Sequence, residues 1–62
     1  MTNLIKLTSV KSMTGLSKST IYAMMNKGVF PKSISIGERS VAWIEMEVQK
    51  WIENKINLSR MA

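Results

Sequence analysis

The fold is decided by the stretch GLSKSTIYAMMNKGVFP, residues 15–31, which holds a short amphipathic helix together with its start and stop signals. Ser17 stands where an N-cap belongs, with a hydroxyl for the free N–H groups of the next turn. Gly28 can take the left-handed conformation that ends many helices, and Pro31 prevents the helix from resuming. Apolar residues at positions i, i+3 and i+4 predict one buried stripe: Ile21, Met24 and Met25.

A shorter helix is predicted just before this one. Thr8 or Ser9 can cap it, and Val10 and Met13 have the spacing that turns both side chains toward the core. Gly15 ends this first helix. Because only the residues TGLS separate the two helices, the sequence predicts a helix-turn-helix.

The side of the second helix opposite its buried stripe carries hydrogen-bonding, small or cationic side chains. A recognition helix needs such side chains near its N-terminus, where they reach base edges while the helix dipole favours a phosphate. A polar outer face alone is typical of any solvated helix, but the lack of Asp and Glu here favours nucleic acid. The candidate DNA-binding residues of this helix are Ser17, Lys18, Ser19, Thr20, Tyr22, Ala23, Asn26 and Lys27.

A β-hairpin follows the two helices. Ser and Ile alternate in residues 33–36, Gly37 breaks the run, and residues 41–43 resume an extended pattern. Such a hairpin could be a wing that lays Arg39 against a phosphate or into a minor groove. An equally weighted alternative is a surface hairpin whose arginine is solvated or paired with Glu38. The candidate DNA-binding residues of this region are Lys32, Arg39 and Ser40.

A final helix is predicted from Ile44 or Glu45 through Asn54, with apolar residues at helical spacing. We assign Trp43 and Trp51 to the core, because an aromatic residue at this spacing packs more often than it stacks on bases. The apolar positions of this helix are Val48, Trp51 and Ile52.

Length and composition limit what the chain can do. Its 62 residues predict one domain over residues 1–62, with a core over about 4–54 and a flexible tail over 55–62. Residues 4–8, LIKLT, alternate only weakly, and we interpret them as a short lead-in to the first helix. There is no cysteine or histidine, which excludes disulfides, zinc fingers and histidine-based catalysis. We therefore expect no metal site, no cofactor and no catalytic residue, so an enzyme is the class that the sequence supports least.

The charges are segregated along the chain. Nine basic and four acidic residues give a net charge of +5, and all four acids follow Gly37. A positive N-terminal half indicates a polyanionic partner, although many small basic proteins have none. Apolar clusters are too short for a membrane span, and no signal-peptide pattern is visible, so we expect a cytoplasmic protein, at the nucleoid when bound to DNA. The lysines of the acid-free half are Lys6, Lys11, Lys18, Lys27 and Lys32.

Residues 13–52 resemble the AlpA-like phage and prophage regulators, small relatives of the MerR-type winged helix and of phage excisionases. The resemblance rests on four motifs in order, TGLS.STIY, G.FP, R.V.W and EV..W. It implies a mainly α fold with a small β-hairpin, a winged helix-turn-helix, that binds double-stranded DNA as a transcription regulator or an excision directionality factor. It also places the helix that begins at Ser17 in the major groove and Arg39 in the wing. Two positions depart from the family pattern, Ala23 where an arginine is usual and Met46 where a serine is common.

A second class of function stays open. The same basic face could dock on a protein, which would make the chain an interaction module for an integrase or other recombinase, a response regulator or RNA polymerase. Membrane binding is not supported, because the helix after Ser17 has few basic residues and no large anchoring aromatic. No heptad seam is present, so we expect a free monomer that assembles cooperatively on neighbouring DNA sites.

Overall fold

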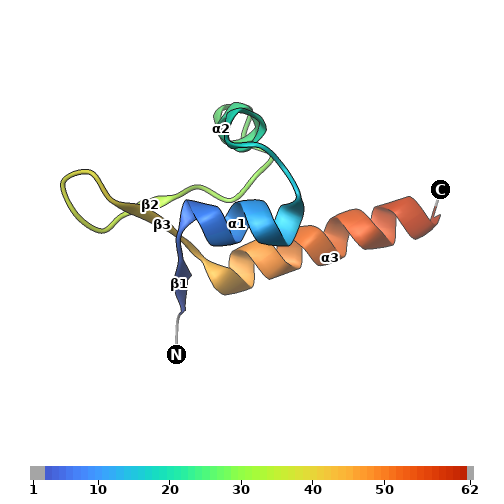
Figure 1. The fold of residues 1–62 in the computed structure, drawn as a ribbon. Helices are drawn as coiled ribbons and strands as arrows, with labels where there is room; N and C mark the ends of the chain where they lie inside the picture. Colours follow the sequence, from blue (N-terminus) through green and yellow to red (C-terminus); the bar gives the residue numbers. More distant parts are fainter. Residues whose placement is uncertain (1–2, 62) are drawn as a thin grey trace.

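Six short elements follow one another along residues 3–61, the part of the chain that the computed structural model describes. Figure 1 shows α2 above α1, the β2–β3 hairpin reaching to one side, and α3 extending to the other side beyond the remaining elements. The predicted mixture of helices with a small hairpin is confirmed, and it is compatible with a small winged-helix-like domain. The elements are β1 (Leu4–Ile5), α1 (Leu7–Thr14), α2 (Lys18–Asn26), β2 (Ile34–Ser35), β3 (Val41–Ile44) and α3 (Glu45–Met61).

The three strands form one antiparallel sheet in the order β1-β3-β2. Leu4 pairs with Ile44 on one side of β3, and Ile34 pairs with Ala42 on the other. The hairpin was predicted from the sequence, but β1 was not, because two residues are too short a run to show alternation. Its pairing is reinforced where the Glu45 N–H donates to the carbonyl of Asn3 at 2.9 Å.

The residues predicted to start and end α2 do so in the structure. The Ser17 side chain accepts a hydrogen bond from the Thr20 N–H at 3.3 Å, which confirms the N-cap. At the other end, Gly28 has a φ of 76°, and its N–H donates a hydrogen bond to the Met25 carbonyl. The Val29 N–H donates a hydrogen bond to the Met24 carbonyl at 3.0 Å, which completes the two-bond pattern of a Schellman motif.

The start of α1 differs from the prediction. The helix begins at Leu7 with Lys6 in the cap position, and no side chain caps it. The prediction that Thr8 or Ser9 caps the helix is therefore wrong, because the chain turns directly from β1 into the helix and places both residues inside its first turn. Its end is as predicted, since Gly15 has a φ of 72° and donates to the Lys11 carbonyl at 2.8 Å.

The core draws one or more residues from each helix and from the sheet. Trp43 is fully buried, as predicted, whereas Trp51 is half-buried and packs against the core from α3. Met24 and Met25, two of the three predicted stripe residues, are also half-buried against it. The buried cluster consists of Val10, Ile21, Phe30, Trp43 and Val48.

The last helix is longer than predicted. It runs to Met61 rather than ending at Asn54, so residues 55–61 of the predicted tail are helical. Neither glycine nor proline interrupts this segment, and Lys55 places its Nζ 5.4 Å from the centre of the Trp51 ring one turn earlier. Ala62, the last residue of that predicted tail, and Met1 and Thr2 of the predicted domain lie outside the described residues. Within residues 3–61, no helix has the length and apolar character needed to cross a membrane.

Candidate nucleic-acid interface

The N-terminal turn of α2 is a solvent-exposed group of small polar and cationic side chains. Ser17, Lys18, Ser19 and Thr20 are all exposed. The hydroxyls of Ser17 and Thr20 lie 2.9 Å apart, so they share a hydrogen bond and fix one another at the helix start. No acidic residue stands in this first turn. The free N–H groups of the helix and its positive dipole end are therefore open to an anion.

Tyr22 differs from its predicted position. Its ring is half-buried and packs edge-on against Trp43, with ring centroids 6.3 Å apart and an interplanar angle of 63°. The prediction that Tyr22 faces away from the core is wrong, because its position next to Ile21 turns it toward β3 at the flank of the buried stripe. The residues of α2 and its C-cap that do remain exposed after the first turn are Ala23, Asn26 and Lys27.

The hairpin holds the second group of candidate residues. The Ile36 N–H donates to the Ser40 carbonyl at 2.9 Å, and the Ser35 hydroxyl donates to the Gly37 carbonyl at 3.1 Å. These bonds hold the tip in a closed turn. Arg39 is exposed at this tip, while Ser40 is half-buried beside it.

The connection between α2 and the hairpin is held by both tryptophans. The Trp43 indole N–H donates to the Pro31 carbonyl at 3.1 Å, and the Trp51 indole N–H donates to the Val29 carbonyl at 2.7 Å. Between these points, Phe30 is buried against the Trp51 ring at 4.8 Å between centroids. Lys32 follows directly and is exposed. The start of the hairpin is thus fixed relative to the end of α2, an arrangement that the sequence analysis missed because indole hydrogen bonds leave no periodic signal.

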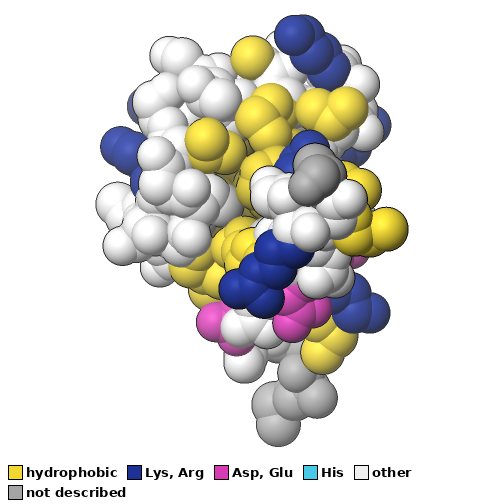
Figure 2. Space-filling model, turned by 90° about the vertical axis from the view of Figure 1, so that its right-hand side faces the viewer, with side chains coloured by type: hydrophobic (Ala, Val, Ile, Leu, Met, Phe, Trp, Pro, Cys, Tyr) yellow, Lys and Arg dark blue, Asp and Glu magenta, His cyan; other side chains and the backbone are white. Residues whose placement is uncertain are grey.

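Charge is distributed unevenly over the molecule. On the face drawn in Figure 2, Asp and Glu side chains lie only in the lower half, whereas some Lys and Arg side chains also lie in the upper part, at the height of α2. This agrees with the sequence, in which no carboxylate precedes Glu38. Among residues 3–61, no three His, Cys, Asp or Glu side chains gather into a group that could hold a metal ion. The exposed groups of α2 and the hairpin can therefore donate hydrogen bonds and positive charge to a polyanion.

Comparison with known proteins gives consistent matches. Residues 3–56 match the model of a family described as prophage CP4-57 regulatory protein (AlpA). The chain is 40% identical to the uncharacterized protein ORF88 of Enterobacteria phage P4, in a match that covers 84% of this chain and 59% of that protein. It is 33% identical to the DNA-binding transcriptional activator AlpA of Escherichia coli (strain K12), in a match that covers 89% of this chain and 87% of that protein. The chain thus spans less than two thirds of the phage protein.

Proposed function

Because the chain belongs to the prophage CP4-57 regulatory protein (AlpA) family, we propose that it binds double-stranded DNA at specific sequences and regulates phage or prophage genes. The observation that carries this proposal is the carboxylate-free, Ser17-capped start of α2, which is exposed, together with the exposed Arg39 at the tip of the hairpin. The resemblance inferred from the four sequence motifs is confirmed by the family match.

In this proposal α2 enters the major groove as the second helix of a helix-turn-helix. Lys18 and Ser19 lie in its first turn, where recognition helices contact phosphates and base edges. Farther along, Asn26 offers an amide that can pair with adenine, and the Ala23 methyl can pack on a thymine methyl. Ser17, Thr20 and Lys27 complete the proposed contacts of this element.

The hairpin is the proposed wing. Arg39 at its tip contacts a phosphate or enters the minor groove, with Ser40 beside it, and Lys32 lies at the base of the hairpin within reach of the backbone. The indole bonds to Val29 and Pro31 support this proposal, because they hold the wing at a fixed distance from α2. A rigid pair of reading elements loses less conformational entropy on binding than two independent ones.

Tyr22 has a different role in this proposal from the one predicted from the sequence. Because its ring packs on Trp43, it positions α2 on the sheet rather than reading bases through its ring. Trp43 also donates to Pro31, so one aromatic pair connects the proposed recognition helix to the base of the wing.

The bacterial relative is described as a transcriptional activator, which favours gene activation over prophage excision as the outcome of binding. An excision directionality factor would use the same DNA contacts but would act beside an integrase. A protein-interaction module for an integrase, a response regulator or RNA polymerase is the alternative in which the basic face meets an acidic partner. A DNA-bound regulator would work in the cytoplasm, at the nucleoid.

The decisive experiment is footprinting on the DNA around the gene of this protein, paired with affinity measurements on the protected duplex and on a shuffled duplex of equal length. The proposal expects a discrete protected region and a clear preference for it over the shuffled duplex. Equal affinity for both duplexes would reject sequence-specific binding. No binding to either would leave the protein-interaction alternative, which calorimetry against the integrase or polymerase tests directly.

A further inference from the structure

The sheet has a second face that points away from the core. Partners directly opposite in a sheet share a face, and side chains alternate along a strand. Trp43 and its partner Ile5 face inward, together with Val41, and all three belong to the core or pack on it. The opposite side, which we call the outer sheet face, includes Leu4, Ile34, Ala42 and Ile44. Ile36 directly follows β2, and its N–H bond to the Ser40 carbonyl continues the pairing, so the alternation puts Ile36 on this face as well.

The outer sheet face is apolar where a solvated sheet face is normally polar. Leu4 is 48% exposed, Ile34 39% and Ile36 45%. Ala42 is only 1% exposed although it lies outside the core cluster. The usual alternation is inverted in β2, where Ser35 shares the inner side with Val41. Contiguous exposed apolar groups of this kind mark an interaction surface.

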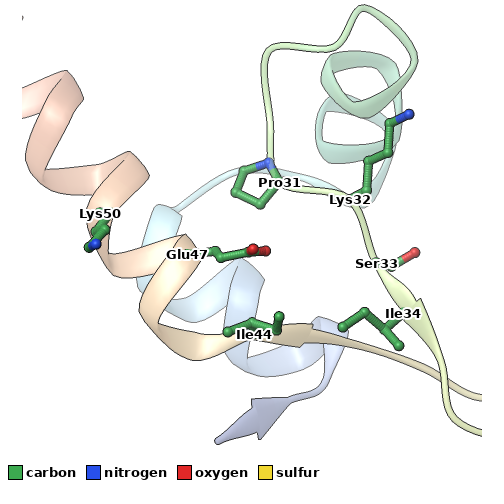
Figure 3. A pocket seen from close by; sticks show the side chains of 7 residues that line it. All are labelled: Pro31, Lys32, Ser33, Ile34, Ile44, Glu47 and Lys50. Atoms are coloured by element: carbon green, nitrogen blue, oxygen red, sulfur yellow. The ribbon is translucent and has the colours of Figure 1, made fainter. Parts of the chain in front are cut away.

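A pocket of about 550 Å³ hollows the outer sheet face where it meets α3. Figure 3 shows the side chains of Ile34 and Ile44 directed toward one another, with Pro31 and the Glu47 carboxylate across the same opening. Lys50, one turn after Glu47 on α3, also lines the pocket. Lys32 lines the pocket from the chain segment before β2, so the border of the apolar face carries the negative charge of Glu47 and the positive charges of Lys50 and Lys32.

We propose that the outer sheet face docks on the same face of a second copy of this chain, in a two-fold symmetric pair. A two-fold interface must be self-complementary. An apolar centre satisfies this condition, and a border with both charge signs satisfies it as well, because Glu47 of one copy can meet Lys50 of the other. A strongly acidic or strongly basic partner would complement only one of the two signs of charge on this border.

The pair is weak in dilute solution, because five apolar residues and their border fall far short of the roughly 20–30 residues a side of a standard interface. This agrees with a monomer at low concentration. None of the exposed residues at the start of α2 belongs to the outer sheet face, so pairing leaves the proposed DNA-reading helix free. Lys32, a proposed DNA contact of the wing, lines the pocket at the edge of this face. Copies held on adjacent DNA sites would pair at high effective concentration, a consequence that rests on the proposed function whereas the pairing itself does not.

The test is sedimentation equilibrium without DNA, from micromolar to millimolar protein. The wild-type chain should show a reversible monomer–dimer equilibrium, and Ile36→Asn should raise its dissociation constant about tenfold or more. Leu58→Asn is the matched control, because Leu58 is 60% exposed on α3 outside the outer sheet face. Thermal melts should show that both variants fold, since both side chains are exposed.

A charge exchange tests the orientation of the pair. Glu47→Lys should weaken association, because two lysines would then face one another across the two-fold axis. The double variant Glu47→Lys, Lys50→Glu should restore association, because position 47 of one copy again carries the opposite charge to position 50 of the other. A monomer at every concentration would overturn the proposal. So would association that Ile36→Asn leaves unchanged or that Leu58→Asn removes, and so would a double variant no tighter than Glu47→Lys alone. Since DNA is absent from these measurements, their failure would be independent of any failure in DNA binding.

Discussion

The indole N–H of Trp51 donates a 2.7 Å hydrogen bond to the carbonyl of Val29, twenty-two residues earlier in the chain. This bond joins α3 to Val29, the last residue of the Schellman motif that ends α2. Phe30 is buried against the same indole, so packing and hydrogen bonding act at one point. The end of α2 is therefore held by α3, and the stability of the fold and the placement of the proposed recognition helix depend on the same side chain.

Two substitutions of Trp51 should separate these contributions. Trp51→Phe keeps an aromatic ring beside Phe30 but leaves the Val29 carbonyl without its donor, so the free energy of unfolding should fall by about 1 kcal/mol. Trp51→Ala also removes the packing and should lower it by about 3 kcal/mol, near the low end for a large aromatic because the ring is half-buried. Urea denaturation followed by circular dichroism measures both values. Equal losses for the two variants would show that the hydrogen bond, and not the packing, dominates.

Substitution of Tyr22 should affect the stability of the fold, whereas substitution of Asn26 should affect DNA binding. Tyr22→Ala removes a half-buried ring from Trp43 and should lower the melting temperature clearly, whereas Tyr22→Phe should leave it nearly unchanged. Asn26 is exposed, so Asn26→Ala should leave the melting temperature intact and weaken specific DNA binding by about 1–3 kcal/mol. Thermal melts and affinity measurements on the footprinted duplex test both expectations. Full stability in Tyr22→Ala would contradict its positioning role.

Local signals made most of the fold predictable. Ser17, Gly15 and Gly28 act through hydrogen bonds and backbone conformations within a few residues of themselves, so the boundaries they predict are confirmed. The start of α1 and the strand β1 depend on pairing with β3, some forty residues away, and no local pattern reveals that contact. The end of α3 was missed for a related reason, because a helix without a stop signal ends where packing and solvent decide.

The candidate site was predictable in part. The helical period assigns Lys18, Ser19 and Asn26 to the solvent side, and they are exposed. Tyr22 lies at the margin of the buried stripe, where the period alone does not distinguish a half-buried ring from an exposed one. The outer sheet face was missed because the alternation of Ser and Ile in residues 33–36 favours isoleucines on the core side, and only the pairing with β3 shows that they lie on the other side.

The electrostatic contribution to DNA binding should appear in its salt dependence. If about four of the candidate cations neutralise phosphates, the logarithm of the affinity should fall with the logarithm of salt concentration at a slope near −4, about −0.9 for each contact. Titrations at several salt concentrations measure the slope, and an affinity insensitive to salt would contradict the basic-face model. The candidate cations are Lys6, Lys11, Lys18, Lys27, Lys32 and Arg39.

Arg39→Ala should report whether the hairpin acts as a wing. Arg39 is exposed at the tip, so the variant should fold normally and should reduce the salt slope by about one contact. A phosphate contact would weaken cognate and shuffled duplexes alike, whereas a minor-groove contact would weaken mainly sites with a narrow groove. Arg60→Ala removes the same charge from the last turn of α3 and serves as the matched control. If the two variants bind every duplex equally well, the hairpin tip lies outside the interface.

Two substitutions of Ser17 can separate its role as N-cap from its role in phosphate binding. Alanine should mainly lower the stability of the fold, whereas aspartate should mainly lower the DNA affinity. Ser17→Ala removes the acceptor for the Thr20 N–H and should lower the free energy of unfolding by about 1 kcal/mol, with little change in charge at the interface. Ser17→Asp keeps a good N-cap and adds a carboxylate at the positive end of the helix dipole, so stability should be retained or increased. The same carboxylate would stand where the proposed phosphate binds, so DNA affinity should fall more for Ser17→Asp than for Ser17→Ala. Chemical denaturation measures the free energy of unfolding, and duplex titration measures the DNA affinity. The control is Ser59→Asp, which adds the same charge at an exposed site near the far end of α3. An aspartate variant that is stable and binds DNA as well as the wild type would show that the start of α2 does not face the phosphate backbone.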